Sequence, residues 1–562
     1  MNILKSITVF LNELRLNSGA IWIEKESIKF SAPLNFQNQE TDNFILHNKS
    51  KLITILKENH IFSKQKFLSV VIFRDKTKTY YPLSFAQERL WFIEQYEEGT
   101  NAYHIPELYE FNSNTDVAGI KYALQQVVSR HEVLRTTVGQ EGDLEYSTQS
   151  VHDEPLIIEE VILTDKDDYK TLLKEDINRP FNLSVEYPIR ATLYTIQSSN
   201  GAAGNQANKT LLLINTHHIA SDGWSIEIFQ KELFTYYEAY LTNNTAFSLP
   251  ALEIQYKDYA VWQRAYLTGA FFEKQLSYWK HKLSGYQTLK LPTDYTRPND
   301  IDYRGSNEEF ILSKEISQKL RSLAQRIGVT LHSTMLSSIN ILLNKYTGQD
   351  DIVVGSVIAN RHHQQTEQLI GFFVNTQANR TLLHKSQSYE ALIQQVQQQQ
   401  IEAQLYQDLP FEKVVDELGV ERDSSRHPVF QVMFGVQSFG NDIKTNDQQK
   451  TYLKPLQIED IYEVAQFDLS ISIDDGKEEL LGQINYATSL FHRNTIVKFI
   501  HHYTYLLDQL TKAPEKAYSE ISLPIAEEYN QDMYQWSNTD NESINAIQAK
   551  NKKMGLVNDL EL

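Results

Sequence analysis

Two adjacent histidines, His217 and His218, are followed closely by an aspartate and a glycine, Asp222 and Gly223. Histidine has an unperturbed pKa of about 6.5, so its imidazole can accept and return a proton near neutral pH. We expect the carboxylate to pair with a cation or to orient the segment, and the glycine to permit a backbone conformation that a Cβ would forbid. These four residues therefore form our candidate catalytic set.

The flanking sequence predicts the elements that position this loop. Residues 211–214 form an apolar run typical of a buried strand, and residues 225–241 have the pattern of an amphipathic helix. The loop thus lies at a strand-to-helix junction. Further long amphipathic helices are predicted at 116–130 and 317–346. The glutamine-rich run 394–400 carries apolar residues at helical intervals and is interpreted as the solvated face of a helix.

A metal site is the competing interpretation of the loop, because His217, His218 and Asp222 are all potential ligands and His362 and His363 could add more. Adjacent residues of an extended segment point to opposite faces, so His217 and His218 should not both reach one ion. We therefore predict no metal and no tightly bound cofactor.

Composition limits the possible functions. The chain has 562 residues, 41% of them hydrophobic, so two or three domains or lobes are expected. A formal net charge of −19 argues against nucleic acid as a partner. No apolar run is long enough to span a bilayer, and the N-terminus lacks a signal-peptide pattern. With no cysteine, thiol chemistry and thiolate metal sites are excluded, and we expect a cytoplasmic protein with no membrane partner.

The first 62 residues predict a small unit of their own. Helical spacing of apolar residues over 3–14 is followed by two alternating stretches, 20–24 and 28–31, and by two further short helices. Such a hairpin offers an edge to which a partner strand could add. A plain stabilising extension of the main body is the alternative. Residues 63–79 are interpreted as a linker, followed by an α/β body.

Seven segments in order resemble the motifs of the condensation domains of nonribosomal peptide synthetases, most closely those of the subclass that joins an L-configured donor to an L-configured or achiral acceptor. Together they extend over more than three hundred residues. They are LSFAQERLWF (83–92), RHEVLRTTV (130–138), HHIASDG (217–223), YKDYAVWQ (256–263), IGFFVNT (370–376), YQDLPFEKVV (406–415) and RHPVFQVMF (426–434).

The resemblance implies a two-lobed, V-shaped α/β fold related to chloramphenicol acetyltransferase, with the histidine loop on the floor of a tunnel. The expected lobes are residues 80–255 and 256–522, followed by a linker-like tail, 523–562. It also implies the reaction. An acceptor amine attacks a donor thioester, and the substrates arrive on phosphopantetheine arms of carrier proteins that approach from opposite openings.

Roles for the loop follow from the same resemblance. His218 is expected to position or deprotonate the acceptor amine, and His217 to hold the loop. Asp222 is expected to pair with Arg361. Gly223 should keep the tunnel floor open, with its N–H toward the oxyanion.

Supporting roles are expected for four residues outside the catalytic set. Trp224 is a tunnel wall or gate, or else a buried aromatic. Arg130 and Arg135 are expected to fix His217 or the lobe interface. Asn375 is a tunnel-lining hydrogen-bond donor or a core residue.

Residues 1–62 resemble the helix-hairpin docking domains of synthetase subunits, with GAIWIEKESIKF (19–30) as the hairpin. Such a domain captures the C-terminal tail of an upstream subunit, and Trp22, Lys25 and Lys29 are the expected docking residues.

The acceptor amine is left open by the resemblance. We expect a stand-alone terminal subunit that releases the chain onto a free amine. The alternatives are an excised elongation domain that uses a carrier-bound aminoacyl acceptor, an acyltransferase with a soluble thioester donor, and a non-catalytic recruiting domain.

Overall fold

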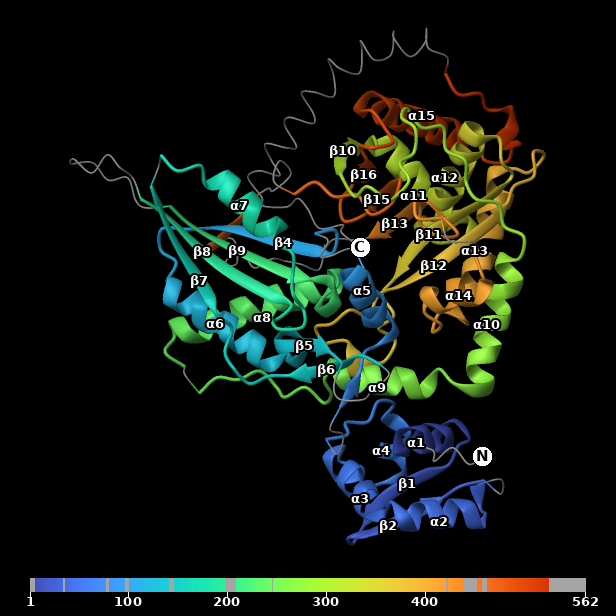
Figure 1. Cartoon of the computed structure of the whole chain (residues 1–562). Coiled ribbons are helices and arrows are strands. Elements are labelled where there is room, and N and C mark those ends of the chain that lie inside the picture. Colours follow the sequence, from blue (N-terminus) through green and yellow to red (C-terminus); the bar gives the residue numbers. More distant parts are fainter. Residues whose placement is uncertain are drawn as a thin grey trace.

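The computed structural model describes residues 6–33, 36–76, 80–96, 101–140, 146–164, 166–197, 209–244, 246–420, 423–437, 452–456 and 462–524. These form a small N-terminal unit and two larger lobes that diverge from a junction occupied by helix α5 (Figure 1). The expected two-lobed α/β fold is confirmed. No described helix is long and apolar enough to cross a membrane.

The N-terminal unit has its own apolar core, to which every one of its elements contributes a buried apolar side chain or a partly buried one packed against it. The expected hairpin and short helices are present. One boundary differs from the prediction, because the segment interpreted as a linker begins with a helix whose Phe67 is fully buried in this core, together with Phe73. The elements are α1 (Ile7–Leu16), β1 (Ala20–Glu24), β2 (Ser27–Ser31), α2 (Gln39–His47), α3 (Lys49–Glu58) and α4 (Lys64–Ser69).

The N-terminal unit is attached to the body by several contacts, among them a helix contact and a set of hydrogen bonds. Helix α1 lies against α9 (Tyr256–Tyr266) (Figure 1). The side chain of Gln365 accepts from the N–H groups of Val71 and Ile72 at 3.0 Å and donates to the Ile72 carbonyl. A single amide therefore pairs three backbone groups of the neighbouring unit.

The first lobe is a five-stranded sheet in the order β14-β4-β9-β8-β7, covered on one face by α6 and α8 and accompanied by a three-stranded sheet, β3-β6-β5. The expected strand at 211–214 is the buried centre of β9, and the expected helices at 116–130 and 225–241 are α6 and α8. The elements are β3 (Tyr81–Pro82), α5 (Phe85–Tyr96), β4 (His104–Phe111), α6 (Val117–Arg130), β5 (Thr136–Gly139), β6 (Thr148–Val151), β7 (Ile158–Thr164), α7 (Tyr169–Asn178), β8 (Ile189–Gln197), β9 (Lys209–His217) and α8 (Gly223–Leu241).

The second lobe is a six-stranded mixed sheet in the order β10-β16-β15-β13-β11-β12, packed with helices. Its elements, with the helix that leads to it, are α10 (Gly269–Leu283), β10 (Gly305–Ile311), α11 (Lys314–Ile327), α12 (Leu331–Thr347), β11 (Asp351–Ile358), β12 (Asn375–Leu382), α13 (Tyr389–Gln404), α14 (Phe411–Leu418), β13 (Val432–Gln437), β15 (Leu469–Asp474), β16 (Leu481–Ala487) and α15 (Arg493–Lys512).

The prediction of one helix over 317–346 was wrong. Gly328 adopts the left-handed conformation at φ +70 and ends α11, and Thr330 caps the N-terminus of α12 by accepting from the Ser333 N–H. A glycine that ends one helix and a threonine that begins the next are the expected punctuation, which the continuous apolar pattern obscured. The glutamine-rich segment lies in α13 with Leu392 and Val396 buried, as expected.

Two segments of the second half of the chain belong to the first lobe. Strand β14 (Leu453–Pro455) pairs with β4 at the edge of the first sheet. Leu369, Ile370 and Phe373 are buried in the core of the first lobe. The second half of the chain therefore contributes segments to the first lobe, and the simple division at residue 255 does not describe their packing.

Candidate active site

The histidine loop leaves the central strand of the first sheet. His217 ends β9, residues 218–220 form one 3₁₀ turn, and Asp222 caps helix α8 by accepting from the Ser225 N–H at 2.9 Å. Backbone bonds from the N–H of His217 to Pro188 and from the N–H of His218 to Tyr103, both 2.9 Å, fix the start of the loop. The junction is thus held by neighbouring chain on both sides.

The two imidazoles are fixed as opposite tautomers. Nδ1 of His218 lies 3.2 Å from the carbonyl oxygen of Ser221, which can only accept, so Nδ1 carries the proton. Nδ1 of His217 accepts from the Ile219 N–H at 3.0 Å, so its proton lies on Nε2, 2.9 Å from Oε1 of Glu94. His218 therefore presents a lone pair at Nε2, whereas both nitrogens of His217 are used within the protein.

His218 is buried, and its Nε2 has no hydrogen-bond partner among the residues described. Burial, and secondarily the neighbouring His217, lower the pKa of His218 to about 4. The ring is therefore neutral at neutral pH. A buried acceptor without a partner is costly unless a ligand supplies a donor, and Nε2 of His218 is placed to accept from one.

Asp222 forms the expected ion pair with Arg361, at 3.0 Å between Oδ1 and Nη2. Its other oxygen accepts from the Phe373 N–H at 3.0 Å, and the Ser225 hydroxyl donates to Oδ1. A second nitrogen of the guanidinium, Nη1, donates to the carbonyls of Thr366 and Leu369. Asp222 therefore joins the loop to the segment between β11 and β12.

Gly223 does not adopt the special backbone conformation that was one of the two roles we expected of it. Its φ is outside the left-handed range, and a Cβ at this position would have no heavy atom within 4 Å. An alanine would therefore fit the backbone. The glycine instead leaves open space beside the loop, at the exposed first residue of α8.

Arg130 and Arg135 do not contact His217, contrary to one of the roles we expected. Arg130 donates to Glu232 at 2.9 Å and to the Pro250 carbonyl, and Arg135 pairs with Asp153 on the surface. The buried charged partner of His217 is Glu94. Arg130 still acts near the site, because Glu232 also binds His131, whose Nδ1 accepts from the Ile370 N–H.

Asn375 is a structural residue and not a tunnel-lining donor. Its Nδ2 donates to the carbonyls of Gln407 and Leu409, both at 2.9 Å, and its Oδ1 accepts from the Phe411 N–H. The side-chain amide is thus fully used in holding residues 407–411.

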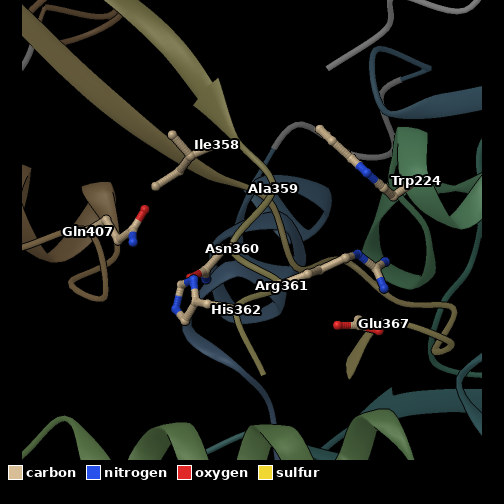
Figure 2. Close-up of a pocket in the computed structure, with 8 residues that line it drawn as sticks. All are labelled: Trp224, Ile358, Ala359, Asn360, Arg361, His362, Glu367 and Gln407. Carbon is tan, nitrogen blue, oxygen red and sulfur yellow. The ribbon is translucent and has the colours of Figure 1, made fainter. Parts of the chain in front are cut away.

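A pocket of about 510 Å³ is lined in part by Trp224, the residue that follows the loop. Figure 2 shows the residues that line it. Trp224, 43% exposed, forms one wall, so it is not a buried aromatic. Arg361 links this pocket to Asp222, and Gln407 belongs to the segment held by Asn375. The lining residues are Trp224, Ile358, Ala359, Asn360, Arg361, His362, Glu367 and Gln407.

The histidines do not gather at a metal site. His362 pairs with Asp408 at 3.0 Å, whereas Nε2 of His217 binds Glu94. Within the described ranges, no three histidine, aspartate or glutamate side chains form a group that could hold an ion.

The three expected docking residues lie on the hairpin of the N-terminal unit. Trp22 on β1 and Lys29 on β2 are direct cross-strand partners, and Lys25 lies in the turn with φ +47. Lys29 is 3.6 Å from Glu24. In the described part of the chain, β2 pairs with β1 alone, so its outer edge carries no strand.

Three groups at the site were not found from the sequence. The sequence does not indicate Glu94, because a lone glutamate in a helix is usually solvent-exposed. It indicates Ser225 only as the first residue of a predicted helix. The Phe373 N–H carries no side-chain signal at all. For Glu94, a signal was available in retrospect: it lies seven residues after Gln87, about two helical turns, and the Gln87 side chain donates to the Ile219 carbonyl.

Comparison with known proteins is consistent with this geometry. The family model described as Condensation domain matches residues 77–533. Tyrocidine synthase 2 of Brevibacillus parabrevis is 33% identical over 452 residues, which cover 80% of this chain and 12% of that protein. Gramicidin S synthase 2 of Brevibacillus brevis is 31% identical over 463 residues, covering 82% and 10%. The chain thus spans about a tenth of the length of these relatives.

Solved structures share the fold. The X-domain from teicoplanin biosynthesis superimposes with a TM-score of 0.70 and 25% identity, covering 80% of this chain and 98% of that one. The first condensation domain of the calcium-dependent antibiotic synthetase gives a TM-score of 0.63 with 16% identity, covering 80% and 100%. The described lobes therefore have the architecture that the sequence motifs predicted.

Proposed function

Because this chain belongs to the condensation-domain family of nonribosomal peptide synthetases, we propose that it joins an acceptor amine to a carrier-bound donor thioester. One observation carries the proposal. Nε2 of His218 is a buried lone pair with no partner among the described residues, on a ring whose tautomer is fixed by the Ser221 carbonyl. Such an atom can accept a hydrogen bond from an amine N–H.

The chemical step balances with this one acceptor. The amine nitrogen attacks the thioester carbonyl carbon, a C–N bond forms, and the oxygen becomes an oxyanion. The nitrogen then gives up a proton, the C–S bond breaks, and the carrier thiolate leaves and is protonated. The Nε2 lone pair of a neutral His218 orients the amine by accepting a hydrogen bond from the amine N–H, and it takes up the proton that the nitrogen gives up. General-base assistance of this kind contributes roughly 10² to 10⁴ in rate.

The test is an amide-forming assay followed by mass spectrometry. A donor acyl group on a carrier protein is mixed with the full chain and either free amines or a carrier-bound aminoacyl acceptor. His218→Ala should lower the rate by roughly 10² to 10⁴. His281→Ala, an exposed histidine on α10, is the matched control and should keep the wild-type rate. Full activity of His218→Ala in folded protein would refute the proposed role.

The same assay distinguishes the substrates. Our expectation of a free acceptor amine stays a prediction: product from free amines supports terminal release, and product only from the carrier-bound acceptor indicates an elongation domain. An acyl group on a soluble thioester replaces the carrier-bound donor in a third arm. Turnover there at the same rate would favour an acyltransferase without a carrier partner.

We also propose that the N-terminal unit binds the C-terminal tail of an upstream subunit along β2. The unpaired outer edge of β2 supports this, because an added strand would satisfy its backbone groups. Exposed Lys25 and Lys29 favour an acidic tail. Fluorescence anisotropy with labelled tail peptides should show weaker binding by Lys29→Glu than by Lys51→Glu, an exposed lysine on α3. Equal weakening by the two variants would contradict this location.

A further inference from the structure

Helix α5 contacts the histidine loop at two points on one face. The Gln87 side chain donates to the Ile219 carbonyl at 3.3 Å, and two turns later Glu94 accepts from Nε2 of His217 at 2.9 Å. The Glu94 side chain is only 3% exposed and His217 is fully buried. Burial of a carboxylate costs free energy of desolvation. Its contact with His217 therefore indicates the role of Glu94.

The bond between Glu94 and His217 determines which nitrogen of that ring can accept. Oε1 of Glu94 accepts a hydrogen bond from Nε2–H of His217. Because the ring proton lies on Nε2, Nδ1 carries a lone pair, which accepts from the Ile219 N–H at 3.0 Å. That second bond closes the 3₁₀ turn on which His218 stands. The opposite tautomer of His217 would place two N–H groups against each other and open the turn.

We propose that Glu94 is a positioning residue of the condensation reaction, which fixes the tautomer of His217 and through it the orientation of His218. The inference rests on the proposed function for its catalytic consequence. Glu94 does not touch the substrates; its effect passes through His217 and the turn.

The surroundings of Glu94 bring its pKa into a range where its ionisation can be followed by experiment. Burial raises the pKa of Glu94 to about 7, and Arg190 on β8 acts in the lowering direction. His217 on β9 faces it directly, and His104 on β4 lies edge-on to His217 at 6.2 Å between ring centres. Burial, and then Arg190, lower the pKa of His217 to about 3, so that ring stays neutral while Glu94 titrates. The ionised carboxylate is the stronger acceptor, and its effect on the turn should weaken as the pH falls through 7.

The test uses Glu94→Leu and Glu94→Gln in the full chain, with Glu88→Gln as the matched control on the same helix. Glu88 pairs with Arg264 and is 42% exposed. Nitrogen-15 NMR of labelled histidine side chains reports the tautomer of His217 without any substrate. We expect the Nε2–H form in the wild type, Glu94→Gln and Glu88→Gln, and loss of that single form in Glu94→Leu.

Kinetics in the amide assay give the second measurement. Glu94→Leu should lower kcat by about 10², the effect expected of a misplaced catalytic group, while KM for donor and acceptor stays near the wild-type value. Glu94→Gln should hold kcat near the level of the protonated wild type, well above that of Glu94→Leu, because its neutral amide oxygen still accepts from Nε2, and its kcat should no longer change through pH 7.

The outcomes separate the two proposals. Absence of amide formation by the wild type would refute the proposed function, and the NMR experiment would still decide the effect of Glu94 on His217. An unchanged tautomer and unchanged kcat in folded Glu94→Leu would overturn the positioning role. If Glu94→Leu does not fold, persistence of the pH 7 limb in Glu94→Gln would overturn it equally.

Discussion

Nη2 of Arg361 lies 3.0 Å from Oδ1 of Asp222, although 139 residues separate the two side chains and they come from opposite lobes. The Arg361 side chain is 6% exposed and that of Asp222 is 1% exposed. The guanidinium also covers the ring of Phe373 at 4.2 Å. One ion pair therefore fixes both the start of α8 and the fold of the segment that follows β11.

Breaking this ion pair should be strongly destabilising. Asp222→Ala leaves a buried guanidinium without its counter-charge, and the expected loss in the free energy of unfolding is about 3–5 kcal/mol. Denaturant unfolding measures it. Asp153→Ala is the control, because that carboxylate is fully exposed beside Arg135 and its loss should leave the free energy of unfolding almost unchanged. The double change Asp222→Ala with Arg361→Met should recover part of the loss, and an additive result would argue against a coupled pair.

Gly223→Ala separates folding from substrate binding. Since no atom lies within 4 Å of the added Cβ and the φ is ordinary, the melting temperature should stay the same or rise slightly. If substrates occupy the open space beside the loop, kcat/KM in the amide assay should fall. Gly435→Ala, also without a neighbour within 4 Å, should leave kcat/KM unchanged. Equal activity of both variants would show that this space is not used by substrate.

Acid should destabilise the fold well before carboxylates with ordinary pKa values titrate. Burial lowers the pKa of many histidines below 6.5, so the unfolded chain binds more protons between that pH and the lowered values, and stability falls with falling pH. Each fully protected histidine contributes up to about 1.4 kcal/mol per pH unit. Those with a pKa lowered to about 3 or 4 are His104, His217, His218, His332, His363, His427 and His502.

Buried acids oppose this trend, because burial raises the pKa of Glu94 to about 7 and of Asp258 to about 6, and it also raises the pKa of Glu107. The histidines outnumber them. We expect the melting temperature to fall from pH 6.5 to pH 4.5, and His332→Gln to reduce the slope. A constant melting temperature over this range would mean that these rings are accessible to protons in the native state.

Gln365→Ala should loosen the N-terminal unit without unfolding either lobe. The change leaves the N–H groups of Val71 and Ile72 without their acceptor, a loss of about 1–3 kcal/mol for partly buried groups. Hydrogen exchange followed by mass spectrometry should become faster around residues 71–73. Gln364→Ala, an exposed neighbour, should keep the wild-type protection. Unchanged exchange in Gln365→Ala would show that the contact of α1 with α9 suffices.

The sequence predicted those parts of the fold whose signals are local. Each of these elements has an apolar pattern that can be recognised within its own residues. Examples are the apolar run of β9, the amphipathic pattern of α6 and the alternating stretches of β1 and β2. The break between α11 and α12 was missed because one glycine is outweighed by an apolar pattern that continues on both sides of it.

At the site, the residue types of the loop and the Asp222–Arg361 pair could be predicted, and the remaining partners could not. Glu94 and Phe373 reach the loop only through the packing of α5 and of the segment after β11. Asn375 shows the converse. We expected it to be either a tunnel-lining donor or a core residue, and backbone groups of residues 407–411 use its hydrogen bonds.

Strand β14 limits how early the first sheet can be completed while the chain is being synthesised. It forms the edge of the first sheet next to β4, with the Leu456 N–H bonded to Leu108 and the Asn112 N–H bonded to Tyr452. On the ribosome, β4 emerges long before these partners exist, and the side of β4 that they cover stays unpaired during that time. Such distant pairings form slowly and leave hydrogen-bonding edges open to other chains. The first lobe can therefore acquire its complete sheet only after most of the second lobe has left the ribosome.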